Sequence, residues 1–155
     1  MKFSQTKDLL NQLVADLSQA STAIHQIHWY LRGANFITWH ERMDDYRKRI
    51  EAQLDEVAER LITIDGAPFS TLEEFAKETK INSIDGRYNR DLNEHISRLI
   101  VLFRTLIEDY QQVIDVAGEE DDNVSEDMAI SFKGELEKLV WMLQAELGHA
   151  PEIDA

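Results

Sequence analysis

HWYLRGANFITWHERMDD, residues 28–45, is the stretch that decides how this chain folds. Gly33 lies between two apolar helical repeats and predicts a tight turn from one helix into the next. A histidine stands on each side of this turn, His28 before it and His40 after it. Because helices joined by only a few residues pack as antiparallel neighbours, we expect His28 to approach His40.

Four long amphipathic segments run along the chain. In each of them apolar residues recur every three or four positions, which is the spacing of one face of an α-helix. The four apolar stripes run from Leu10 to Leu31, Met43 to Ile64, Leu92 to Val113 and Met128 to Leu147. The sequence therefore predicts an all-α protein, a four-helix bundle formed by one domain that spans residues 1–155.

Turn and capping residues mark where these helices stop and start. A glycine falls at each break between segments, at Gly33, Gly66, Gly86 and Gly118. Gly134 lies inside the fourth helix, where we expect it to mark a close contact with another helix. Asn123, followed three residues later by Glu126, predicts the N-terminal cap of that helix.

The connection between the second and third helices is long, from Gly66 to about Tyr88. Thr71 and Glu74 form a capping-box pattern that opens a short extra helix with the sequence LEEFAKE. Antiparallel neighbours need only a few connecting residues. This connection is therefore expected either to cross the length of the bundle or to cover something.

The composition narrows the classes of function. A net charge of −14, from 30 acidic and 16 basic residues, argues against nucleic-acid binding, which needs clustered Lys or Arg. An acidic surface serves solubility alone or gathers cations, and charge by itself does not decide. No apolar run approaches the roughly 18 residues of a membrane helix, and a signal-peptide pattern is lacking. The chain has no cysteine and so no disulfide, which favours a cytoplasmic protein. From the charge and the short apolar runs we expect it to bind neither DNA nor a membrane.

Four potential metal ligands form a stripe of their own on the second helix. Relative to His40, Asp44 lies at ~40° around the helix axis, at ~100° per residue. Asp55 and Glu59 follow at ~60° and ~100°, whereas the apolar stripe centres near ~285°. The four side chains therefore lie away from the face that makes the core, unlike the ligands of a di-iron site inside a ferritin bundle.

His40 and Glu59 cannot bind one ion within a single chain. They are nineteen residues apart, or ~28 Å along a helix, whereas ligand atoms lie ~2 Å from a metal. Two copies of the helix, packed antiparallel about a two-fold axis near Arg49, remove this conflict. The His40 end of one chain then faces Asp55 and Glu59 of the other, and two equal sites result.

His28 joins this set across the turn at Gly33. Two imidazoles and up to three carboxylates with open positions suit Fe(II), and Zn(II), Mn(II) or Co(II) can also enter such a site. Each pair alone, His40 with Asp44 or Asp55 with Glu59, is most often a solvated surface pair. The combination, with a symmetry that reconciles both spacings, favours a metal centre.

Two residues beside these ligands carry weaker hypotheses. His25, three residues before His28, is more often bonded to a backbone or carboxylate group than to a metal. For Trp29 packing is the ordinary role. The alternative is that Trp29 donates an electron when an oxidant at the site lacks enough Fe(II).

A family resemblance follows from these residues. IHQIHWYLRGANFITWHERMDD, followed by LDEVAERL, resembles the signature of the Dps family, the ferritin-like mini-ferritins. The likeness is greatest to the Gram-positive Dps-like peroxide resistance proteins. It continues through GAPFSTLEEF to DDNVSEDMAISFK and LVWML, and so covers nearly the whole chain.

The resemblance implies a hollow homododecamer with a ferroxidase centre between two-fold-related subunits. The implied metal ligands are His28, His40 and Asp44 of one subunit with Asp55 and Glu59 of the other. The family oxidises Fe(II), preferably with hydrogen peroxide, and stores the ferric mineral inside the shell. An iron-storing ferroxidase of this kind protects against oxidative stress, and Zn(II) or another divalent metal can replace Fe(II).

The resemblance also implies acidic pores, which Asp122 and Asp127 would line by motif position. Helix capping and solvation at the start of the fourth helix are the alternative for both residues. The chain departs from the family in lacking a lysine-rich tail, since it ends in PEIDA. Two rival functions remain: a DNA-compacting Dps protein, and a non-catalytic helical scaffold.

Overall fold

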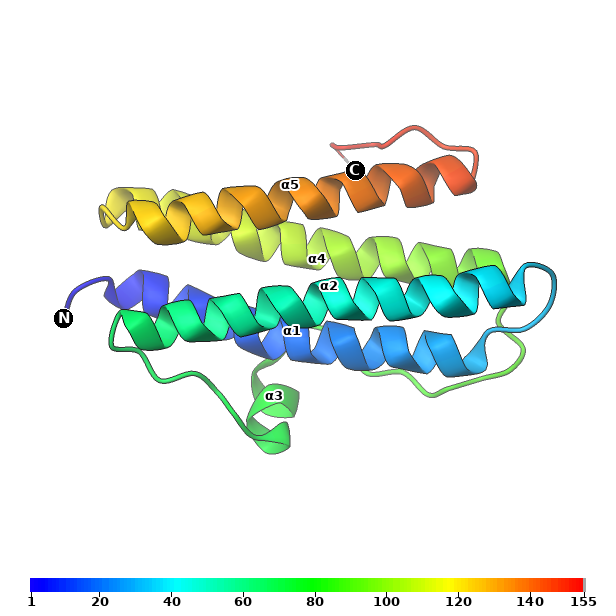
Figure 1. Ribbon diagram of the computed structural model, residues 1–155, viewed down its shortest axis with the longest axis horizontal. Helices are drawn as coiled ribbons and strands as arrows, with labels where there is room; N and C mark the ends of the chain where they lie inside the picture. Colours follow the sequence, from blue (N-terminus) through cyan, green and yellow to red (C-terminus); the bar gives the residue numbers. More distant parts are fainter. Residues whose placement is uncertain (155) are drawn as a thin grey trace.

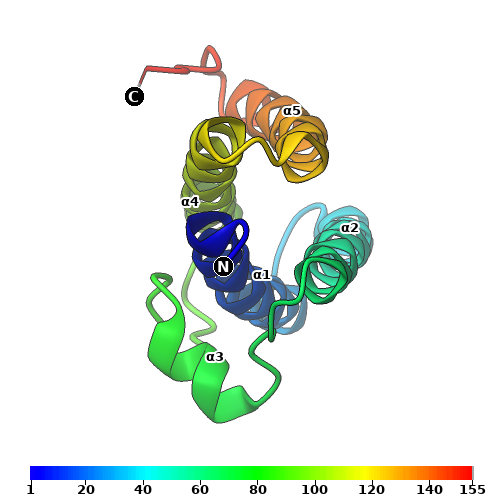
Figure 2. The same ribbon diagram turned by 90° about the vertical axis from the view of Figure 1, so that its left-hand side faces the viewer.

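The computed structural model describes residues 1–154, which form five helices and no strand. The helices are α1 (Ser4–Tyr30), α2 (Phe36–Thr63), α3 (Leu72–Glu78), α4 (Leu92–Glu119) and α5 (Asn123–Glu146). Figure 1 shows the four long helices lying side by side. The end view in Figure 2 shows them around one core, with the short α3 outside them near α1. The predicted four-helix bundle with one short extra helix is confirmed.

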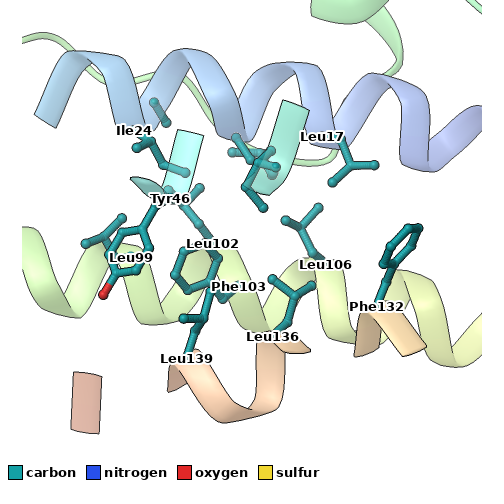
Figure 3. Close-up of a cluster of buried hydrophobic side chains, with 14 of the residues drawn as sticks. Leu17, Ile24, Tyr46, Leu99, Leu102, Phe103, Leu106, Phe132, Leu136 and Leu139 are labelled. Atoms are coloured by element: carbon teal, nitrogen blue, oxygen red, sulfur yellow. The ribbon is translucent and has the colours of Figure 1, made fainter. Parts of the chain in front are cut away.

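The apolar stripes pack together as the core of this bundle. Figure 3 shows Leu17 and Ile24 of α1 among Phe103 and Leu106 of α4 and Leu136 of α5, all of which are fully buried. Burying one such side chain contributes about 2 kcal/mol to folding. The periodicity read from the sequence therefore identifies the residues that hold the helices together.

The helices form two antiparallel hairpins, α1 with α2 and α4 with α5. The link between the hairpins, residues 64–91, runs along the bundle from one end to the other (Figure 1), so α2 and α4 point the same way. Of the two expectations for the long connection, crossing the length of the bundle is confirmed.

The turn between α1 and α2 depends on two residues with left-handed backbone angles. Gly33 has φ of 99° and Asn35 has φ of 66°, conformations that glycine and asparagine adopt more readily than other residues. The amide of Phe36 donates a hydrogen bond of 3.2 Å to the carbonyl of Gly33. The chain therefore reverses within residues 31–35, and the end of α1 meets the start of α2.

The predicted caps have mixed outcomes. Thr71 caps α3 as predicted, accepting a 3.1 Å hydrogen bond from the amide of Glu74. The prediction for α5 is wrong by one residue, because Asp122 and not Asn123 is the cap and accepts from the amide of Ser125. The expectation for Gly134 is also wrong within residues 1–154, because a Cβ there would meet no atom within 4 Å.

Buried polar side chains fasten the connection where it leaves α3. Asp16 of α1 is fully buried and accepts hydrogen bonds from the Thr79 hydroxyl at 2.7 Å and from the Lys80 amide at 2.8 Å. The Lys80 ammonium contacts the carboxyl group of Asp109 of α4, which is also buried. Burial, and next the neighbouring Asp16, raise the pKa of Asp109 to about 8. These contacts hold the connection against α1 and α4.

Across residues 1–154, none of the helices combines the length with the apolar character that crossing a lipid bilayer requires.

Candidate metal centre

The two histidines that flank the turn hold each other in place. The Nδ1 of His28 lies 2.7 Å from the carbonyl oxygen of His40, and the Nδ1 of His40 lies 2.8 Å from that of His28. The two rings stack with centroids 3.6 Å apart and an interplanar angle of 14°. The predicted approach of His28 to His40 is therefore confirmed.

These reciprocal hydrogen bonds select one form of each ring. A carbonyl oxygen only accepts, so each Nδ1 carries the hydrogen and donates it. In a neutral imidazole the Nε2 then keeps its lone pair, which is what a metal ion needs. A ligating histidine usually has its second nitrogen bonded in this manner. His28 and His40 therefore fit a metal site by an observation independent of their spacing.

Helix ends supply one of the two acceptors. The last four carbonyls of a helix have no amide partner further along the chain. His28 lies within the last turn of α1, and its carbonyl accepts from the His40 ring instead. The carbonyl of His40 accepts from His28 near the start of α2. The turn at Gly33 thus creates this arrangement by bringing the two helix ends together.

Asp44 lies one helical turn beyond His40, beside His28. Its Oδ1 is 3.8 Å from the Nε2 of His28, and its side chain is 42% exposed. That separation is too long for a hydrogen bond. It agrees with two ligand atoms that lie on either side of one ion, each at ~2 Å from it.

Asp55 and Glu59 lie further along α2, and both are exposed. They are not brought near His28 or His40 within the chain. Among residues 1–154, no three His, Asp or Glu side chains converge as a metal-binding group. Within the chain, His28, His40 and Asp44 therefore lie together near the start of α2, apart from Asp55 and Glu59.

Aromatic rings surround the histidines on the outside of α1. The ring of Trp29 lies 3.9 Å from that of His25, and Trp29 is 62% exposed. Partial burial, followed by the charges of Arg47 and His28, lowers the pKa of His25. Trp29 therefore packs against His25 but leaves most of its side chain exposed.

Arg47 is a neighbour of the predicted ligands that was given no role from the sequence. Its Nη2 lies 3.9 Å from the Oδ1 of Asp44, and its Nη1 lies 3.4 Å from the Oε1 of Glu51. The hydroxyl of Ser21 on α1 donates a 3.0 Å hydrogen bond to the same oxygen of Glu51. The spacing of Arg47 three residues after Asp44 and four before Glu51 was a signal that could have found this cluster.

The two aspartates predicted for a pore have different surroundings. Asp122 is buried, and its carboxylate forms a 2.7 Å ion pair with Arg60 and bonds to Ser125. Burial works to raise the pKa of Asp122, but hydrogen bonds from Ser125 and Arg60 outweigh it and leave that pKa below its ordinary value. Asp127 is exposed. The capping role named as the alternative is the one that Asp122 has in this chain.

A cavity elsewhere in the molecule contains none of the predicted ligands. It measures about 540 Å³ and lies between α4, α5 and the segment after α5, with Val101, Arg104, Val140 and Ile153 among its lining residues. The predicted metal ligands lie on α1 and α2 instead.

The chain matches the family model described as ferritin-like domain over residues 7–153. It is 47% identical over 150 residues to the DNA protection during starvation protein of Streptococcus suis, covering 97% of this chain and 87% of the relative.

Solved structures show the same likeness. The X-ray structure of Dps from Listeria monocytogenes has a TM-score of 0.92 and 44% identity, covering 94% of this chain and 95% of the other. Dps from Listeria innocua soaked with cobalt has a TM-score of 0.93 and 42% identity, covering 97% of this chain and 99% of the other.

Proposed function

This chain belongs to the ferritin-like family and, within it, to the Dps mini-ferritins, and from that premise we propose that it is an iron-storing ferroxidase. Fe(II) is its substrate and hydrogen peroxide its preferred oxidant. The ferric product is stored inside a homododecamer, which protects the cell from oxidative damage. Because the reaction consumes ferrous iron, we expect it to take place in the reducing cytoplasm.

This proposal rests on the reciprocal hydrogen bonds between His28 and His40. Their Nδ1 atoms bond to each other's carbonyls, and this leaves each Nε2 free to bind Fe(II). Asp44 supplies an oxygen 3.8 Å from the Nε2 of His28. Mixed imidazole and carboxylate ligands with open positions suit Fe(II), and they also accept Co(II) or Zn(II).

We propose that a second subunit completes each site. Asp55 and Glu59 are exposed on α2 and lie ~22–28 Å along the helix from His40, at 1.5 Å per residue. An antiparallel partner about a two-fold axis near Arg49 places the partner's Asp55 and the partner's Glu59 beside His28 and His40. Both ends of the contact then hold equal sites.

The proposed reaction balances without a further reductant or oxidant. Two Fe(II) ions give up one electron each, and one hydrogen peroxide accepts both electrons with two protons. The products are two Fe(III) ions and two waters. Avoiding release of hydroxyl radical requires that both Fe(II) ions are held at the site together, so that peroxide receives both electrons there. The carboxylates stabilise the higher charge of Fe(III) more strongly than they stabilise Fe(II).

The pore and the aromatic ring keep subordinate roles in this proposal. Asp127, exposed in the first turns of α5, is the residue that would line an acidic entry for Fe(II). Asp122 would not line such an entry itself and would only hold the start of α5 in place, since its carboxylate is bonded to Arg60 and Ser125. Trp29 is proposed to donate an electron when peroxide exceeds Fe(II), because it is exposed beside the ligand His28.

The relatives' name raises DNA protection as a second candidate function. With a net charge of −14, direct binding to phosphates is unfavourable, so we propose that any protection is chemical. A gel shift of plasmid DNA at low salt separates the two candidates. Retardation of the plasmid by metal-free protein would favour direct binding and contradict the chemical route.

Subunit mixing tests both the site and its two-chain origin. His28→Ala and Asp55→Ala are each expected to abolish oxidation of Fe(II) by peroxide beyond the rate in protein-free buffer. When the two variants are coexpressed, half of the random pairs are mixed, and each mixed pair has one intact site of its two. The coexpressed protein should therefore recover about a quarter of the wild-type rate.

Asp45→Ala is the matched control, since Asp45 is an exposed carboxylate beside Asp44 and is not a proposed ligand. Its ferric absorbance should develop at the wild-type rate. No recovery on coexpression of correctly assembled variants would contradict a site shared between chains. A wild-type rate equal to that of buffer would contradict the ferroxidase and leave the non-catalytic scaffold or the DNA-compacting protein.

A further inference from the structure

We propose that Arg47 is the counter-cation of the iron site. It neutralises Asp44 in the metal-free protein and keeps only its contact with Glu51 when Fe(II) binds. This inference rests on the proposed function, because it assumes that Asp44 is a ligand. It adds a residue that binds no metal itself but sets how readily the metal enters.

Arg47 and a bound metal ion would compete for the same oxygen atom of Asp44. The Oδ1 of Asp44 lies 3.8 Å from the Nε2 of His28 and 3.9 Å from the Nη2 of Arg47. The oxygen placed to share a metal with His28 is therefore the oxygen that already faces the guanidinium. A cation that binds between Asp44 and His28 must repel Arg47 or displace it.

Arg47 is already in contact with a second carboxylate, that of Glu51. The Nη1 of Arg47 lies 3.4 Å from the Oε1 of Glu51, one helical turn further along α2. Glu51 is held by the 3.0 Å hydrogen bond from Ser21 of α1. When Arg47 leaves Asp44 it keeps this carboxylate, so no unpaired charge remains beside the core.

The position of Arg47 on its helix also favours this role. It occupies a step of the apolar stripe of α2 between Met43 and Ile50, both of which are buried. Its Nε is buried without a hydrogen-bond partner, although its side chain is 32% exposed. The inner part of the side chain is therefore packed, and the two outer nitrogens carry its contacts to Asp44 and Glu51. An exposed surface arginine would not be committed in this way.

Co(II) titration of the metal-free assembly, followed by calorimetry without peroxide, tests the proposal apart from enzyme activity. Arg47→Gln should bind Co(II) about fivefold more tightly, the size expected for removing a partly exposed competing charge. Arg47→Lys keeps the charge and should stay within about twofold of the wild type. Lys138→Gln on α5 removes the same charge from an exposed, remote position and should change nothing.

A double-mutant cycle tests the transfer to Glu51. Glu51→Gln should weaken Co(II) binding in the wild-type background, because displaced Arg47 then loses its receiving carboxylate. In the Arg47→Gln background the same change should have a much smaller effect on Co(II) binding, because Glu51 then has no guanidinium to receive. An equal effect in both backgrounds would overturn the transfer, and circular dichroism shows whether each variant is folded.

The failure of this inference differs from the failure of the proposed function. If wild-type protein binds no Co(II), or His28→Ala binds it as well as the wild type does, the metal centre itself is wrong. If His28→Ala loses binding but Arg47→Gln binds as the wild type or more weakly, only the role of Arg47 is overturned. The same holds if Arg47→Lys behaves like Arg47→Gln, since shape and not charge would then be responsible.

Discussion

A histidine becomes a metal ligand through what its other nitrogen does. His28 and His40 each donate Nδ1–H to the other's carbonyl, so the tautomer that leaves each Nε2 free is fixed within the chain. The spacing of the two residues in the sequence predicted that they meet. It did not predict that each would fix the tautomer of the other, because that depends on the angle at which α2 returns along α1.

Trp29 offers a prediction at the scale of a single side chain. Trp29→Phe should leave the melting temperature nearly unchanged, because the indole is 62% exposed and contributes little packing. It should alter radical formation and raise protein damage when peroxide exceeds Fe(II). Spin-trapping at excess peroxide measures this, with Trp141→Phe as the control because Trp141 is half exposed on α5, whereas the predicted ligands lie on α1 and α2. Equal radical yield and damage in Trp29→Phe and wild type would remove Trp29 from the mechanism.

Individual helices are held by charged residues at their ends and edges. Asp122 caps α5 through Ser125 and also pairs with Arg60 of α2, so one carboxylate joins two helices. Asp16 and Asp109 do the same for the connection after α3. The carboxyl groups of both clusters are buried, and removing one partner of a buried ion pair such as Asp122 with Arg60 is costly.

Asp122→Ala is therefore expected to destabilise the protein by about 3 kcal/mol at neutral pH, since it removes a cap and leaves Arg60 unpaired. The pKa of Asp122 is held below its ordinary value, so its stabilising contribution is present above that value and is lost as pH falls through the folded pKa. Urea unfolding should show a large gap between variant and wild type at pH about 7 and a smaller gap at pH about 2.5. Asp127→Ala, at an exposed position, is the control. A gap that is constant with pH would show that the charge of Asp122 is not responsible.

Asp109 predicts the opposite pH dependence. Its pKa is raised to about 8, first by burial and then by Asp16, so the folded protein holds a proton that the unfolded chain has released. Stability from this group is therefore greatest below its ordinary pKa and falls as pH rises toward about 8. Asp109→Asn cannot lose that proton, and its melting temperature should fall less between pH about 6 and about 9 than that of the wild type. Asp115→Asn, exposed on the same helix, should follow the wild type. If Asp109→Asn also follows it, Asp109 is not the titrating group.

At the scale of the whole molecule, local pattern predicted the fold well. Apolar residues at helical spacing, such as Leu17 and Phe103, lie in the core because periodicity alone decides which face is buried. Gly134 and Asn123 were misread, because open space and the choice of a cap depend on packing that spacing does not reveal. Contacts distant in sequence, such as Lys80 with Asp109, were not predicted, since no periodic signal links the two positions.

The whole assembly carries the last prediction. The chain brings His28 of α1 beside His40 and Asp44 near the start of α2, while Asp55 and Glu59 are exposed further along that helix. Because we propose that two chains complete each site, activity should require assembly. Native mass spectrometry should give about 216 kDa, the mass of twelve chains of 18.0 kDa, and a larger mass after loading with iron.

Dissociating the assembly by dilution or mild acid, and returning it to neutral pH just before the assay, should reduce the initial rate of Fe(II) oxidation. The rate should fall in proportion to the fraction of chains that have lost their partner. Circular dichroism on the same sample establishes that the separated chains remain helical, so that loss of activity reports the missing partner and not unfolding. Folded single chains that oxidise Fe(II) at the assembled rate would show that the partner's Asp55 and the partner's Glu59 are not needed.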